Sequence, residues 1–221
     1  MSTGAKQALA NAVLSLINPG DEVVIPTPYW VTYSALVDLA EGVNKFIHCG
    51  IETDFKLTAA QLEAAITLQT RMFIFSSPCN PTGSVYSYDE LAALVTVFEK
   101  YPNITILSDE IYEYINYKGK HESIAQFASI KDRVVVVNGM SKGFAMTGWR
   151  LGYLAGSVAL VQACEKLQSQ FTSGANSITQ RASIVALTAS LEPTIQMTKA
   201  FQERRDYVIG ALSAMNGLKV N

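Results

Sequence analysis

Cysteine, histidine and charge are all scarce in this sequence, and each scarcity excludes a class of protein. The three cysteines, Cys49, Cys79 and Cys164, are widely spaced and odd in number, which argues against a disulfide framework and for a reducing compartment. The only histidines, His48 and His121, do not lie at a metal-ligand spacing from each other or from a cysteine, so we expect no zinc centre and treat both as surface or hydrogen-bonded residues. Charged residues make up 16% of the chain and the net charge is -2, which gives no bias toward nucleic acids or anionic membranes. Small metabolites are therefore better candidate partners than polymers.

Long hydrophobic runs are missing as well. The apolar run 8–17 is too short to span a bilayer, and no basic segment followed by an apolar stretch and a cleavage site begins the chain. We therefore expect a cytoplasmic protein with no membrane segment. What the chain does have is 221 residues, 49% of them hydrophobic, which is enough for one large core and the start of a second domain.

Short apolar or β-branched runs alternate with segments of helical spacing over most of the chain. The expected strands are 22–25, 44–48, 71–76, 104–108, 133–138 and 150–155. The expected helices are 5–17, capped by Ser2, Thr3 and Gly4, then 30–40, 58–66, 88–100 and 157–170. This alternation predicts an α/β fold, with a mostly parallel central sheet and helices on both of its faces.

The pattern from Ser177 onward is helical almost to the end. It breaks near Glu192 and Pro193, and residues 217–220 could begin another strand. We expect residues 1–200 to form a large domain that is incomplete at its N-terminus. Residues 201–221 would then be a connecting helix and the start of a small domain that is largely absent, so the chain would be an internal piece of a longer protein.

A single lysine, Lys142, lies among small residues in the segment 139–152, which follows an expected strand. A partly desolvated amine near the cation Arg150 would be more nucleophilic than a free lysine, as Schiff-base chemistry requires. Taken alone, a surface lysine is the simpler interpretation. The segment also imitates part of a phosphate-binding loop, but Trp149 and Arg150 stand where a nucleotide-binding loop needs Lys followed by Ser or Thr, so we exclude nucleotide binding.

The segment 139–152 resembles, residue for residue, the lysine motif of class I aminotransferases, which are fold type I enzymes dependent on pyridoxal 5′-phosphate (PLP). The resemblance implies that Lys142 carries PLP as a Schiff base, and that Ser141 and Arg150 bind its phosphate. A planar guanidinium suits bidentate phosphate binding, which agrees with the role of Arg150.

Two further motifs carry the same resemblance. Asn80 lies in an Asn-Pro-Thr-Gly turn after an expected strand, and Asp109, Glu110 and Tyr112 follow another. The family implies that Asn80 and Tyr112 hydrogen-bond the phenolic oxygen of PLP and that Asp109 pairs with the pyridine nitrogen, where a buried anion would keep that nitrogen protonated. Lys142, Asp109 and Tyr112 are thus the implied catalytic residues. Glu110 would be only solvated, and Cys79, which has no partnered base, would serve packing.

The N-terminal part of the chain contributes two more groups. The first turn of the first helix offers free N–H groups and small residues to a phosphate, and the family places its phosphate loop here, which implies Gly4 and Ala5. In the bacterial aspartate-using branch, a lysine at the position of Lys6 helps to bind the side-chain carboxylate of the substrate. Trp30, in a Pro-Tyr-Trp motif, would stack on the cofactor ring. Lys6, Trp30 and Asn80 would also face the substrate.

The implied reaction is transamination between an amino acid, by preference aspartate or another acidic one, and a 2-oxo acid. In it Lys142 moves a proton from the substrate Cα. The resemblance also implies a homodimer, while the charge balance and the short apolar runs lead us to expect no nucleic-acid or membrane partner. The family's N-terminal segment, with a tyrosine lent across the dimer, and its small domain, with an arginine for the α-carboxylate, cannot be located in the chain.

Three alternatives remain open. A C–S lyase or a cyclopropane-forming synthase of the same fold uses nearly the same lysine, aspartate and arginine. The PLP-binding sensing domain of a transcription regulator is another, but it needs a DNA-binding module, and no basic helix-turn-helix segment is visible. The third is a truncated piece that folds without catalysis.

Overall fold

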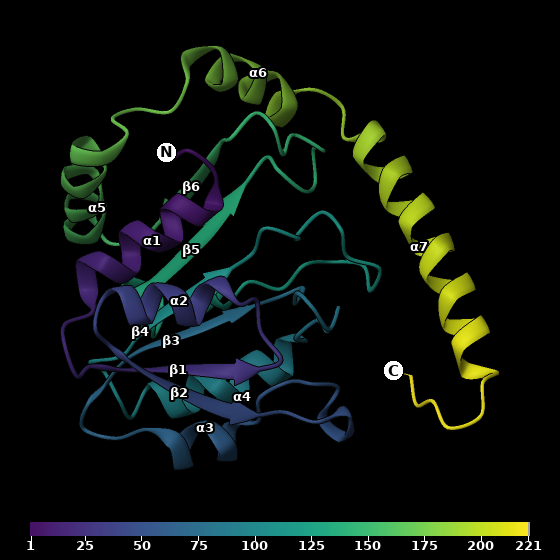
Figure 1. Cartoon of the computed structure of the whole chain (residues 1–221), viewed down its shortest axis with the longest axis horizontal. Helices are drawn as coiled ribbons and strands as arrows, with labels where there is room; N and C mark the ends of the chain where they lie inside the picture. Colours follow the sequence, from purple (N-terminus) through teal and green to yellow (C-terminus); the bar gives the residue numbers. More distant parts are fainter. Residues whose placement is uncertain (221) are drawn as a thin grey trace.

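Six strands form one sheet in the computed structural model, which describes residues 1–220. The strands are β1 (Glu22–Thr27), β2 (Val43–His48), β3 (Thr70–Ser76), β4 (Thr105–Asp109), β5 (Val134–Gly139) and β6 (Gly152–Ala155). Their order is β2-β1-β3-β4-β5-β6, and every pair is parallel except β5 with β6 at one edge (Figure 1). The expected α/β fold with a mostly parallel sheet is confirmed.

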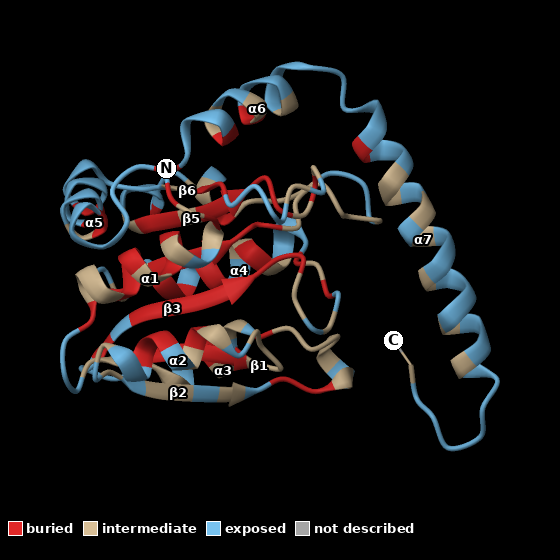
Figure 2. Cartoon of the chain, turned by 45° about the horizontal axis from the view of Figure 1, so that its top comes forward, coloured by how far each residue is buried: buried red, intermediate tan, exposed pale blue. Residues whose placement is uncertain are grey.

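Helices cover both faces of this sheet, as expected. On one face lie α1 (Ala5–Leu16), α2 (Thr32–Leu39) and α5 (Val158–Phe171), and on the other lie α3 (Ala59–Ala65) and α4 (Tyr88–Phe98). Alternation along β1 shows why: Val23 and Ile25 pack against the first group of helices, whereas Val24 packs against the second. Parallel strands buried on both faces read as continuous apolar runs, and the strands in the middle of Figure 2 are accordingly buried.

The starts of two helices differ from expectation. Ser2 does not cap α1: its backbone pairs with Gly152, the first residue of β6, and Gly4 is the N-cap without a side-chain hydrogen bond. The helix α2 begins at Thr32, so Trp30 lies in the loop between β1 and α2 and is free to face the sheet edge. By contrast, α3 and α4 begin as the sequence suggests, with capping boxes at Thr58 and Ser87.

Two helices extend beyond the sheet. These are α6 (Ser177–Thr188) and α7 (Glu192–Ser213), with the break at residues 189–191 and Pro193 inside the first turn of α7, where no intrahelical N–H bond is needed. Figures 1 and 2 show α7 opposite the carboxyl ends of the parallel strands and largely exposed. The expected strand at 217–220 is wrong, since these residues pair with no strand in the described chain. The domain boundary at residue 200, which falls inside α7, stays a prediction.

Cys49, Cys79 and Cys164 are all free thiols. Within residues 1–220, no helix has both the length and the apolar character that a bilayer crossing requires.

Candidate active site

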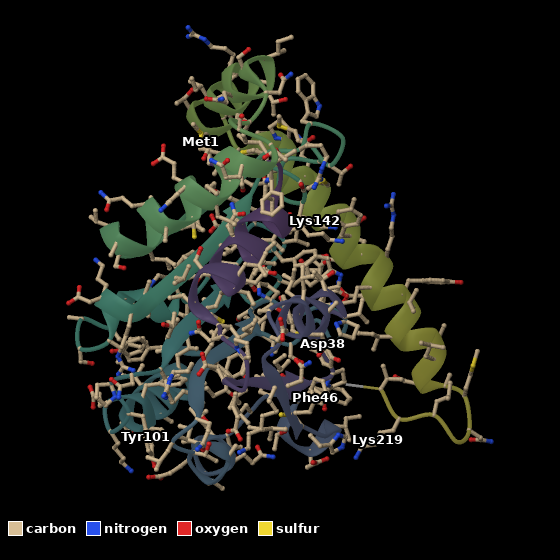
Figure 3. The ribbon with its side chains drawn as sticks, turned by 60° about the vertical axis from the view of Figure 1, so that its left-hand side comes forward. Met1, Asp38, Phe46, Tyr101, Lys142 and Lys219 are labelled. Carbon is tan, nitrogen blue, oxygen red and sulfur yellow. The ribbon has the colours of Figure 1, made fainter. Side chains whose placement is uncertain are left out.

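The carboxyl ends of β1, β3, β4 and β5 meet the N-terminus of α1 around a cavity of about 260 Å³. Nine of the ten residues singled out in the sequence line it: Ala5, Lys6, Trp30, Asn80, Asp109, Tyr112, Ser141, Lys142 and Arg150. In Figure 3, Lys142 lies between α1 and α7, far from Tyr101 at the opposite end of the sheet. A larger cavity of about 460 Å³ between α1, α5 and α6 has Glu165 as its one charged side chain, so the smaller cavity is the candidate site.

Asp109, the last residue of β4, provides a buried carboxyl group that is 3% exposed. Its Oδ2 accepts a hydrogen bond of 2.8 Å from the Tyr33 hydroxyl, and its Oδ1 accepts one of 3.2 Å from the Ile111 N–H. Burial raises the pKa of Asp109 from its ordinary value of 3.8 to about 6, although these two hydrogen bonds and the charge of Lys142 oppose the rise. A cation placed against this carboxyl would therefore favour its ionised form.

Lys142 lies in the loop after β5 and extends its amine over the Tyr112 ring, with Nζ 5.4 Å from the ring centre. The loop is held from the other side by α7, where the Thr194 hydroxyl donates a 2.8 Å hydrogen bond to the Gly143 carbonyl oxygen. Asn80, from the turn after β3, lines the same cavity. An amine, an amide and a phenol are thus gathered from three separate loops.

A cationic part of the cavity forms where Arg150 meets the start of α1. Arg150 Nη1 donates a 2.8 Å hydrogen bond to the Thr147 carbonyl oxygen, and Nη2 lies 3.5 Å from that of Thr3. Gly4 does not line the cavity but explains this approach: its φ is +89°, and a Cβ there would lie 2.2 Å from Arg150 Nη2. Among the described residues, the N–H groups of Ala5 and Lys6 donate no hydrogen bond, so they remain available to an anion.

Aromatic side chains close another side of the cavity. Lys6 Nζ lies 4.9 Å from the centre of the Trp30 ring, and Trp30 meets Tyr33 edge to face at 5.8 Å. Sequence reasoning missed Tyr33, although it follows Trp30 by three residues, a spacing that returns to the same side of a helix. It also missed three lining residues that give little chemical signal, namely Ser76, Ile111 and Thr147.

Glu110 corrects one expectation, because it is not solvated but 4% exposed. Its Oε1 accepts hydrogen bonds from the hydroxyl groups of Ser108 and Ser123 at 2.9 and 2.7 Å, and its Oε2 lies 2.9 Å from His121 Nε2. Glu113 completes a group whose possible ligand atoms lie within 4.8 Å of one another. The partners Ser123 and His121 come from a loop that returns to β4, and the local sequence gives no sign of that return.

Comparison with known proteins agrees with this geometry. Residues 1–221 match the family described as aminotransferase class I and II. The chain is 48% identical over 220 residues to an aspartate/prephenate aminotransferase of Nitrosomonas europaea, covering 99% of this chain and 55% of the relative. It is 45% identical to a bifunctional aspartate aminotransferase and glutamate/aspartate-prephenate aminotransferase of Petunia hybrida, with 100% and 47% covered.

Solved structures give the same result. The aspartate aminotransferase of Rhizobium meliloti superposes with a TM-score of 0.96 at 45% identity, covering 98% of this chain and 55% of that one. The Thermus thermophilus aspartate aminotransferase with maleate gives a TM-score of 0.91 at 36% identity, covering 96% and 56%. The chain spans about half the length of these relatives. Both its sequence and its structure place the chain in the class I and II aminotransferase family.

Proposed function

We propose that the protein containing this chain is a PLP-dependent aminotransferase that acts on aspartate or another acidic amino acid and a 2-oxo acid. The observation that carries the proposal is that Lys142, Asp109 and Arg150 line one cavity. The three parts of PLP each need one of these groups: the aldehyde needs an amine, the pyridine nitrogen a buried carboxyl group, and the phosphate a guanidinium.

The residues of the cavity fit this cofactor. The free N–H groups at the start of α1 and the Arg150 side chain provide donors for a phosphate, and Gly4 leaves the space that Arg150 occupies. Asp109 is buried and would be ionised by a neighbouring pyridinium. When bound, PLP supplies an electron sink for the bond that breaks at the substrate Cα.

The chain's own residues then have separate roles. Lys142 would hold the cofactor aldehyde through its amine, and the same amine, when free, would carry the proton from the substrate Cα to the cofactor C4′ as base and then acid. Asp109 holds the proton on the ring nitrogen. Tyr112 and Asn80 orient the ring through its phenolic oxygen, and Trp30 covers a flat face and excludes water.

The choice of an acidic substrate is supported by Lys6, which lines the cavity beside Trp30. The relatives are named for aspartate and prephenate, and the Thermus thermophilus structure contains maleate, a dicarboxylate.

A homodimer is part of the proposal, and light scattering that finds a monomer would contradict it. A C–S lyase of the same fold is the second candidate; incubation with aspartate and 2-oxoglutarate separates the two, because only transamination produces glutamate.

The central test is Lys142→Ala in the full protein. Borohydride reduction of the wild-type protein with PLP should attach a pyridoxyl group to the peptide containing Lys142, detected by mass spectrometry. The Lys142→Ala protein should show neither the label nor turnover, because it lacks the amine that binds the aldehyde and moves the proton. Lys166→Ala, an exposed position on α5, is the matched control and should keep both. A label on another lysine, or turnover without Lys142, would reject the assignment.

A further inference from the structure

Tyr33 is buried beside the cavity and has no role in the proposal above. It comes from the first turn of α2, is 2% exposed, and donates its hydroxyl proton to Asp109 Oδ2, 76 residues further along the chain. Burial raises the pKa of Tyr33 well above its ordinary value, and the charge of Asp109 adds to the rise. The hydroxyl group is therefore protonated, and a donor, at neutral pH.

The hydrogen bond from Tyr33 fixes the orientation of the Asp109 carboxyl group together with a second hydrogen bond from the backbone. Oδ1 is already held by the Ile111 N–H at 3.2 Å, so with Oδ2 on Tyr33 at 2.8 Å each oxygen has one donor from the protein. Ser76 lies near the Tyr33 hydroxyl as well, but its Oγ meets the geometry of a hydrogen bond with no group of the described residues. Tyr33 is thus the side-chain donor that fixes the rotation of this carboxyl.

The ring of Tyr33 touches a second group of the cavity. Its edge-to-face contact with Trp30 has an interplanar angle of 89°, and Trp30 in turn lies under the Lys6 amine. One buried side chain therefore contacts both the anion of the cavity and the aromatic residue that lines it.

We propose that Tyr33 is a positioning residue, whose hydroxyl group orients Asp109 toward the cofactor ring nitrogen and keeps it ionised, while its ring supports Trp30. This inference rests on the proposed function, because the nitrogen belongs to PLP. The charged groups that face Asp109 are Lys142, from the loop after β5, and Glu110, next to it in the chain; both are unchanged when Tyr33 is replaced.

Tyr33→Phe tests the hydroxyl group separately from the ring. In the full protein without cofactor, the midpoint of the pH titration of the Asp109 side chain, followed by carboxyl ¹³C chemical shift, should move upward, because the ionised form loses a donor. Affinity for PLP should fall on the order of tenfold, as expected for one buried hydrogen bond to a charged group. Borohydride labelling of Lys142 should persist at saturating PLP.

Two matched variants control for the loss of a tyrosine hydroxyl elsewhere. Tyr86 is also buried, at 4% exposed, and its hydroxyl accepts a hydrogen bond of 2.8 Å from the Leu57 N–H; the Tyr29 hydroxyl donates one of 3.0 Å to Ser34 Oγ. Tyr86→Phe and Tyr29→Phe should leave the Asp109 midpoint and the PLP affinity unchanged. If Tyr33→Phe does not fold, 3-fluorotyrosine at position 33 preserves the shape and strengthens the donor, so the midpoint should move downward.

A double-mutant cycle completes the test. In an Asp109→Asn background, Tyr33→Phe should have little further effect on PLP affinity, since the group it orients is gone. An unchanged midpoint and affinity in Tyr33→Phe, or a full additional loss in the double variant, would overturn the inference. Failure of the proposed function is a different result, because then even the wild-type protein would acquire no label at Lys142.

Discussion

At the scale of one residue, the buried carboxyl group of Asp109 lowers the stability of the fold at neutral pH when no ligand is bound. The carboxyl group binds its proton more tightly in the folded chain than in the unfolded one, because burial raises its pKa to about 6. The tighter binding of this proton in the folded chain stabilises the fold fully below about pH 4, and the stabilisation is lost as the pH rises from there through about 6. At neutral pH the cofactor-free protein keeps a buried anion that only two hydrogen bonds and Lys142 compensate.

Asp109→Asn should accordingly stabilise the cofactor-free protein at pH 7 while it abolishes turnover. A shift of about two pKa units corresponds to an upper limit of about 3 kcal/mol, reduced by any hydrogen bond that the amide cannot accept. Urea unfolding at a series of pH values checks this, and the advantage of the variant should shrink as the pH falls from 6 to 4. Lower stability than the wild type at pH 7 would show that the carboxyl is not penalised by burial.

The sequence predicts the chemical groups of the site better than the groups that support them. Lys142 and Asn80 could be singled out because their segments resemble motifs of a known family; taken alone, they would be a surface lysine and an ordinary turn. Tyr33 has the residue type of a core position, and only the folded chain brings it to Asp109. The burial of Glu110 could not be predicted either, because its partners arrive through a loop with no local signature.

At the scale of elements, one arginine ties the end of α4 to the start of β5. The guanidinium of Arg133 donates hydrogen bonds to the carbonyl oxygens of Phe98, Tyr101 and Ile104 at 2.6, 2.8 and 3.1 Å. These carbonyls end the helix and lead into β4, where intrahelical partners are no longer available. Burial lowers the pKa of Arg133 from its ordinary value, the expected cost of this position.

Arg133→Ala should therefore lower the free energy of unfolding by about 2 kcal/mol, because three partly buried carbonyl groups lose their donor. Arg71→Ala is the matched control: Arg71 bonds the Leu68 carbonyl at 2.9 Å and pairs with Asp21 at 3.6 Å, but its side chain is 44% exposed, so its loss should cost less than about 1 kcal/mol. Urea denaturation of both variants decides, and equal effects would rule out this capping role.

Elements that carry their own signals could be predicted, and elements that depend on neighbours could not. Ser87 and Glu90 form a capping box at the start of α4, a local signal because each side chain satisfies a free N–H group within three residues. The start of α1 offers Ser2 and Thr3 as possible caps, yet Ser2 instead pairs with Gly152, which is distant in sequence. The predicted strand at 217–220 had the right composition but no neighbour to pair with among the described residues.

At the scale of the whole molecule, α7 is attached to the sheet mainly through loops of the site. Thr194 bonds to the loop that carries Lys142, and the Thr198 hydroxyl donates a 2.9 Å hydrogen bond to the Tyr114 carbonyl oxygen. Further along, Arg205 lies over the Tyr117 ring at 4.6 Å. Thr194 is the buried residue of this helix, and apolar side chains such as Ile195 and Val208 are about half exposed.

A protein limited to residues 1–221 should therefore open first at α7, because local unfolding follows the elements with the least buried contact. Trypsin should cut after Lys199, Arg204 or Arg205 before it cuts at Lys45 or Arg71 in the sheet, as followed by mass spectrometry over time. Thr194→Val removes the hydrogen bond to Gly143 and should accelerate the cuts in α7 by several-fold to tenfold, with those in the sheet unchanged. Thr188→Val, which removes a hydroxyl bonded only within α6, is the control and should change neither rate. Cleavage within the sheet before α7 would contradict this order of opening, and equal rates for Thr194→Val and Thr188→Val would show that the bond to Gly143 does not hold α7.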